Sequence, residues 1–167
     1  MFRRLTDFGK SWEYESEATL KMLRALDDAS LGRAAEPGGR TLGRLAWHLV
    51  LSVGEMMRRT GLDVKGPAED TPVPEHAADI AAAYEEAAAS LDEEIRLEWS
   101  DKSLESEDDM YGGRWKRGVT LLALLMHQAH HRGQMTVVMR LAGLKVPGLY
   151  GPAREEWASL GMQPPEI

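Results

Sequence analysis

Apolar residues recur at three- and four-residue intervals in four separate stretches of the chain, a spacing typical of helices with one buried face. The first stretch predicts a helix over residues 6–30. The second predicts a helix that begins after Thr41, whose hydroxyl can cap it, and ends near Gly61. The inward positions of this second helix are expected to be Leu42, Leu45, Ala46, Leu49, Val53, Met56 and Met57.

Two less regular segments flank the third helical stretch. Residues 61–75 contain three prolines, of which Pro74 is placed to open a helix whose inward positions run from Ile80 to Ile95. Residues 75–109 hold thirteen acidic side chains against only Arg96 and Lys102, which indicates a solvated surface. Residues 100–117 lack a helical stripe and predict a loop with short extended pieces.

The last helical stretch, residues 118–141, has apolar residues on nearly every face of the predicted helix. This pattern is typical of a central helix or of a subunit interface. A short amphipathic segment over residues 153–160 predicts a brief C-terminal helix. No stretch shows a convincing alternating pattern. The sequence therefore predicts an all-α fold in which residues 1–167 form a single four-helix-bundle domain.

Composition narrows the function classes. The formal net charge of -7 argues against a protein that grips a phosphate backbone, so no nucleic-acid partner is expected. The chain has no cysteine, so a metal would be bound by nitrogen or oxygen. No apolar run approaches the ~20 residues of a membrane span, and no secretory signal is recognisable. We expect a cytoplasmic protein without a membrane partner.

Three of the five histidines are candidate metal ligands. His127 and His131 are four residues apart, so their imidazoles leave the same helix face one turn apart. For such a pair alone, hydrogen bonds to neighbouring helices or partial exposure to water are the more ordinary explanation, but His48, at the edge of an inward stripe, is a candidate third ligand. Three imidazoles leave a position open for water or substrate. His130 points elsewhere around its helix, and His76 is expected at the surface.

Two further polar residues are candidates for a catalytic role beside the ion. Gln134 lies one turn after His131 on the predicted inward seam and can orient a ligand or a bound water. A hydrogen bond to another helix is the alternative for Gln134. Glu55 lies ~10 Å along its helix from His48, too far to share the ion. We expect Glu55 to contact the substrate or to act on the ion through another residue. The alternative is that Glu55 is an ordinary surface carboxylate.

These motifs resemble the DinB (YfiT-like) superfamily. The resemblance rests on His127-Gln-Ala-His-His-Arg-Gly-Gln134, on the solitary His48 and on the later segment Val-Pro-Gly-Leu-Tyr-Gly-Pro-Ala-Arg-Glu-Glu-Trp ending at Trp157. It implies an up-down-down-up bundle, often dimeric, in which His48, His127 and His131 bind one divalent metal ion. Imidazole accepts zinc, nickel, iron and copper, and zinc is the expected metal, with nickel or iron as alternatives. The family is named for DNA-damage-inducible expression, which describes regulation and not DNA binding.

Relatives in this superfamily, such as bacillithiol transferases and mycothiol-dependent maleylpyruvate isomerases, use the metal with low-molecular-weight thiols. By analogy, the ion would lower the pKa of a bound thiol and present it as a nucleophile. The chain has no second domain like that of the isomerases and is too short for the sulfoxide-synthase relatives, so those activities are not expected.

Three hypotheses follow from the sequence and the resemblance. The first is a metal-dependent transferase that moves a low-molecular-weight thiol onto an electrophile in stress response or detoxification. The second is a metal-dependent hydrolase, in which the ion activates water. The third is a non-catalytic stress-response protein whose metal serves structure, ligand sensing or subunit assembly. The expected partners are a small-molecule substrate and a second copy of the chain in a homodimer.

Overall fold

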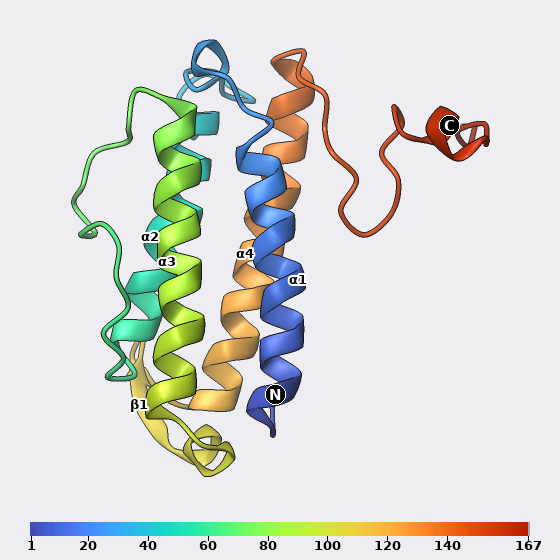
Figure 1. Cartoon of the computed structure of the whole chain (residues 1–167). Helices are drawn as coiled ribbons and strands as arrows, with labels where there is room; N and C mark the ends of the chain where they lie inside the picture. The colour runs from blue at the N-terminus through green and yellow to red at the C-terminus, as the bar shows by residue number, and fades with distance from the viewer. Residues whose placement is uncertain (167) are drawn as a thin grey trace.

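A computed structural model of the chain describes residues 1–166 and contains four long helices. They are α1 (Leu5–Leu23), α2 (Leu42–Arg58), α3 (Ala77–Glu98) and α4 (Arg117–Leu141). The chain ascends through α1, descends through α2 and again through α3, and ascends through α4 (Figure 1). The predicted up-down-down-up bundle is therefore confirmed.

Each long helix packs against two others. Helix α1 contacts α3 and α4, and α2 contacts the same two helices. Because α2 and α3 both descend, the connection between them must return along the outside of the bundle (Figure 1). The indole Nε1 of Trp47 donates to the carbonyl of Thr71 at 2.8 Å, and Arg58 Nε donates to the carbonyl of Val64 at 3.0 Å. These two bonds fix the connection to α2.

The short elements lie in the connections. They are the 3₁₀ helices η1 (Asp28–Ser30), η2 (Asp101–Glu105) and η3 (Trp157–Leu160), and the strands β1 (Glu107–Met110) and β2 (Gly113–Lys116). The strands form an antiparallel hairpin in which Met110 pairs with Gly113. The two turn residues, Tyr111 and Gly112, have φ of 51° and 85°, as a tight hairpin turn requires. The extended pieces expected between residues 100 and 117 are this hairpin.

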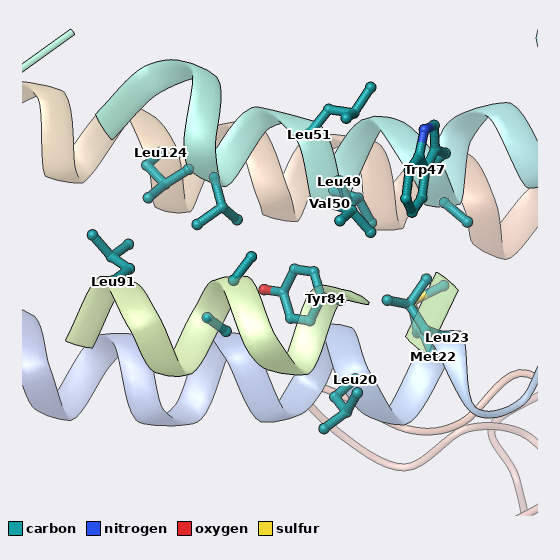
Figure 2. Packing of buried hydrophobic residues seen from close by; sticks show 14 of the residues in the cluster. Leu20, Met22, Leu23, Trp47, Leu49, Val50, Leu51, Tyr84, Leu91 and Leu124 are labelled. Carbon is teal, nitrogen blue, oxygen red and sulfur yellow. The ribbon is translucent and has the colours of Figure 1, made fainter. Parts of the chain in front are cut away.

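The core consists of the inward stripes of all four helices. All seven predicted inward positions of α2 are buried. Figure 2 shows leucines and other large apolar side chains from the four helices, with Leu91 and Tyr84 of α3 facing Leu124 of α4 and Leu49 of α2 across the interior. The three- and four-residue spacing of the sequence therefore selects the buried faces correctly.

Two predicted helix boundaries are wrong, and one pair of aspartates explains both. The first helix ends at Leu23 and not near residue 30, because Asp27 starts a new helical turn by accepting a hydrogen bond from the Ser30 amide at 2.8 Å. Helix α3 begins at Ala77 and not directly after Pro74. The Asp28 carboxylate accepts a hydrogen bond from the Ala77 amide at 2.8 Å and so caps α3 from another element.

The predictions for the C-terminal part need two corrections. Gln134 and Leu141, expected on the inward seam of α4, are exposed. A straight helix has 3.6 residues per turn, so a seam drawn at 3.5 rotates away from the core over successive turns. The short C-terminal helix is the four-residue η3, which is shorter than the predicted segment of residues 153–160.

The segment before η3 is tied to the bundle by side chains of α1. Lys21 Nζ donates to the Gly148 carbonyl at 2.9 Å, and the Tyr150 hydroxyl donates to Glu15 Oε2 at 2.7 Å. Beyond this segment, the chain ends away from the bundle (Figure 1). None of the helices within residues 1–166 is long and apolar enough to cross a membrane.

Candidate metal centre

The three predicted ligands lie together between α2 and α4. Nε2 of His48 and Nε2 of His127 are 3.0 Å apart, and the ring of His131 lies 4.5 Å from the ring of His48 and 4.4 Å from that of His127, centre to centre. One nitrogen from each ring falls within 4.8 Å of the other two. Nitrogens on a tetrahedral zinc ion are about 3.3 Å apart. The donor set and its spacing therefore fit one divalent cation.

Helix packing accounts for this convergence. His127 and His131 leave one face of α4 a turn apart, and His48 faces them from α2. Between them, the buried Gln128 joins the two helices, because its Nε2 donates to the Leu49 carbonyl and to Ser52 Oγ, both at 3.0 Å. These two hydrogen bonds fix the position of α4 along the axis of α2 near the histidines.

Gln134 orients one of the rings. Its amide Oε1 lies 2.7 Å from Nδ1 of His131, so Nδ1 donates the hydrogen bond. A neutral imidazole carries one proton, so Nε2 of His131 keeps its lone pair. An outer partner of this kind is what a metal-binding histidine needs to hold its tautomer and direction. The catalytic role assigned to Gln134 from the sequence stays a prediction.

The site favours neutral imidazoles. Burial lowers the pKa of His48 to about 4, with smaller contributions from the neighbouring histidines and from Arg40 and Arg44. Burial also lowers the pKa of His127 and of His131, and the positive charge of Arg40 adds to both effects. At neutral pH, all three rings therefore offer lone pairs to a cation without first losing a proton.

A cavity of about 480 Å³ opens beside His48 and His127. This volume is within the range of small-molecule sites. The cavity is lined by residues of α2 and α4, by the β hairpin and by the α2–α3 connection, namely Arg44, His48, Leu51, Ser52, Glu55, Met56, Glu69, Tyr111, Trp115, Ala123 and His127. A ligand in this cavity would contact His48 and His127, two of the three candidate metal ligands.

Glu55 lines this cavity but is not among the converging ligands. Its Oε1 accepts a hydrogen bond from Arg59 Nε at 2.7 Å, and its Oε2 accepts one from the Tyr111 hydroxyl. Both carboxylate oxygens are therefore engaged, and the second bond holds the turn of the hairpin against α2. This geometry supports positioning of the cavity wall more directly than general base catalysis, and the catalytic role of Glu55 stays a prediction.

The other two histidines lie where the sequence places them. His130 is exposed, and its Nε2 lies 3.2 Å from Gln134 Nε2, outside the cluster of three. His76 is exposed and contacts Asp28 at the start of α3, 2.9 Å from ring nitrogen to carboxylate oxygen.

Sequence reasoning missed three residues of the site. Gln128 is a polar residue in an apolar helix, and a buried amide in such a helix signals a cross-helix hydrogen bond. Tyr111 belongs to a hairpin turn, where tyrosine gives little local signal. Arg44 stands one turn before His48, and only the fold shows that it lines the same cavity.

Comparison with known proteins agrees with this architecture. The sequence profile of the DinB family matches residues 1–166. The uncharacterized protein YrdA of Bacillus subtilis strain 168 is 45% identical over 167 residues, which is the full length of both chains. The chain therefore belongs to the DinB family, as its histidine motifs indicated.

Solved structures extend the comparison. A DinB-like protein from Bacillus cereus ATCC 10987 superposes with a TM-score of 0.87 at 44% identity, covering 90% of this chain and 100% of that protein. The DinB-like protein YjoA of Bacillus subtilis superposes with a TM-score of 0.66 at 15% identity, covering 86% of this chain and 97% of that one. At such low identity, the second likeness concerns the fold alone.

Proposed function

We propose that this DinB-family protein binds one divalent metal ion, most simply zinc, and transfers a low-molecular-weight thiol to an electrophile. Nickel and iron are the alternative metals. The observation that carries the proposal is the convergence of His48, His127 and His131, neutral at physiological pH, beside a cavity of small-molecule size. Three nitrogen ligands leave a coordination position open, which is typical of reactive and not of structural sites.

The ion would supply Lewis acidity, which lowers the pKa of a thiol in the cavity. Side chains of the protein would hold the ion and position the residues around it. His48, His127 and His131 would hold the cation, Gln134 would keep His131 in the required tautomer, and the Tyr111–Glu55 bond would hold the hairpin wall in place. The thiol sulfur would form a bond to an electrophilic carbon, the leaving group would depart with the electron pair of its bond, and the thiol proton would pass to solvent.

The test compares two histidine variants of α4. Untagged protein should contain close to one equivalent of metal by elemental analysis and should consume a thiol together with a model electrophile. His127→Ala should lose both the metal and the turnover. His130→Ala, which removes an exposed ring three residues away on the same helix, should retain both.

Other outcomes select the other hypotheses. Turnover that needs the metal but no thiol would identify a hydrolase. Metal-replete protein that is inert with every thiol and ester tried, and that loses thermal stability on chelation, would contradict catalysis and identify a non-catalytic metal-binding protein.

A further inference from the structure

Two arginines at the start of α2 lie beside the histidine cluster without a partner. Within the described part of the chain, Arg40 and Arg44 make no ion pair and no side-chain hydrogen bond, and both are exposed. Other arginines commonly have carboxylate partners, as in the pairs Arg117–Asp108, at 2.9 Å, and Arg140–Glu155, although the exposed Arg3, Arg33 and Arg154 have none in the described part of the chain.

Their position is unfavourable for the fold. The first turn of α2 contains no acidic residue, and positive side chains repel the partial positive charge at this end of a helix. The chain has an excess of acidic residues, so partners for two arginines are not scarce. Helix stability therefore does not explain why two unpaired cations lie here.

The cavity gives the charge of Arg44 a target. Arg44 lines it together with His48 and His127, whereas Arg40, one turn earlier, lines a different cavity beside Gln134. Glu55, one of the two carboxylates of the cavity, accepts hydrogen bonds from Arg59 Nε and from the Tyr111 hydroxyl, so both of its oxygens are engaged by residues other than Arg44. Arg44 is therefore a cationic residue of the cavity that has no carboxylate partner in the described part of the chain, and a bound divalent ion would add positive charge beside it.

We propose that the thiol bound in this cavity carries a carboxylate, which pairs with Arg44 while its sulfur faces the three histidines. Arg40 adds attraction at longer range, and Tyr111 and Trp115 of the hairpin form the aromatic wall beside the carbon chain of the ligand. This inference rests on the proposed function, because it names the substrate class of the same site. A guanidinium matches a carboxylate through paired N–H donors, which explains why arginine suits this task.

The test measures equilibrium binding of two small thiols to metal-loaded protein by calorimetry. 3-Mercaptopropionate carries a carboxylate and 2-mercaptoethanol does not, whereas both present a thiol to the metal. The natural protein should prefer 3-mercaptopropionate by about fivefold, the size expected for one exposed ion pair. Arg44→Gln should remove most of this preference, and Arg40→Gln should reduce it less.

Two variants control for indirect effects. Arg44→Lys should keep part of the preference because the charge remains, and Arg154→Gln, which removes an exposed arginine from the C-terminal segment, should leave it unchanged. Each variant is compared at equal metal content. Equal affinity of the natural protein for both thiols would overturn the inference, as would a full preference in the double variant Arg40→Gln, Arg44→Gln.

The proposed function and the inferred ligand class can fail separately. Metal-dependent turnover with neutral thiols, without a carboxylate preference, would leave the proposed function standing and end this inference. Preferential, Arg44-dependent binding of 3-mercaptopropionate by a protein that transfers no thiol would uphold the inferred ligand class and contradict the proposed reaction.

Discussion

Gln134 shows how an exposed side chain can control a buried one. Its amide oxygen accepts the hydrogen bond from Nδ1 of His131, a ring that is only 5% exposed, and so leaves Nε2 free to face the cluster. The sequence placed this glutamine inward. In the structure, it reaches its partner from the surface, one helical turn away.

Removing this hydrogen bond should weaken metal binding more than it weakens the fold. Gln134→Leu should lower zinc affinity by about tenfold, the usual effect of losing an outer partner of a metal-binding histidine, while the urea midpoint changes little because residue 134 is exposed. Competition with a zinc chelator gives the affinity. Gln134→Glu keeps the acceptor and should bind zinc at least as well as the natural protein. Equal losses in both variants would rule out the orienting role.

The lowered imidazole pKa values make the metal-free protein sensitive to acid. The pKa of His48 is about 4 in the folded protein because of burial and about 6.5 in the unfolded chain. Below pH 6.5, the imidazole of His48 therefore binds a proton more readily in the unfolded chain than in the folded protein. The free energy of unfolding should fall as pH decreases from 6.5 toward 4, by about 1 kcal/mol for this half-exposed ring.

Chemical denaturation of metal-free protein at several pH values measures this effect. His48→Gln should flatten the pH dependence over that window relative to the natural protein. An unchanged slope in the variant would show that other groups cause the acid sensitivity.

At the scale of elements, one aspartate joins two helices that are distant in sequence. Asp28 lies in η1 and caps α3 through the Ala77 amide, while its other oxygen contacts His76. Asp28→Ala should lower the free energy of unfolding by about 1 kcal/mol, as expected for loss of a helix cap. Asp28→Asn keeps an acceptor oxygen and should cost less. Urea titration compares them, and identical losses would indicate that the charge and not the cap matters.

The elements with strong periodicity could be predicted from the sequence, and those defined by distant contacts could not. Helix α2 has an apolar stripe and a capping threonine, and Thr41 Oγ1 does accept a hydrogen bond from the Arg44 amide. The hairpin was harder to predict because strand β1 reads Glu-Asp-Asp-Met, without apolar alternation. The start of α3 depends on Asp28, 49 residues before Ala77, and no local pattern records such a contact.

The same distinction applies to the site. The four-residue spacing of His127 and His131 predicts that they share a helix face. The prediction of His48 as the third ligand depends on its place beside an inward stripe and on the family resemblance. The bond from Gln128 to the Leu49 carbonyl crosses between helices over 79 residues of sequence, so only the packed bundle reveals it. Arg44 and Tyr111 reach the cavity for the same reason.

At the scale of the whole molecule, α4 leaves apolar side chains uncovered on its outer face. Met126 is 64% exposed, Val137 55% and Leu141 48%. These positions are spaced along one side of the helix, and we expect a second copy of the chain to cover them in a homodimer.

Sedimentation analysis tests this prediction. The natural protein should sediment as a dimer at micromolar concentration, and Val137→Glu should shift it toward monomer without loss of metal. Leu97→Glu, which alters a leucine on α3 that is 70% exposed, should leave the dimer intact. A natural protein that is monomeric throughout this range would contradict the expectation.

The distribution of the three histidines over two helices has a consequence for metal exchange. His48 is 79 residues from His127 along the chain, so in an unfolded chain it is not held beside the histidines of residues 127–131. An ion held by all three rings fastens α2 to α4 and stabilises only the folded protein. Local separation of α2 and α4 would take His48 away from the ion, so conditions that open the folded bundle should speed metal loss.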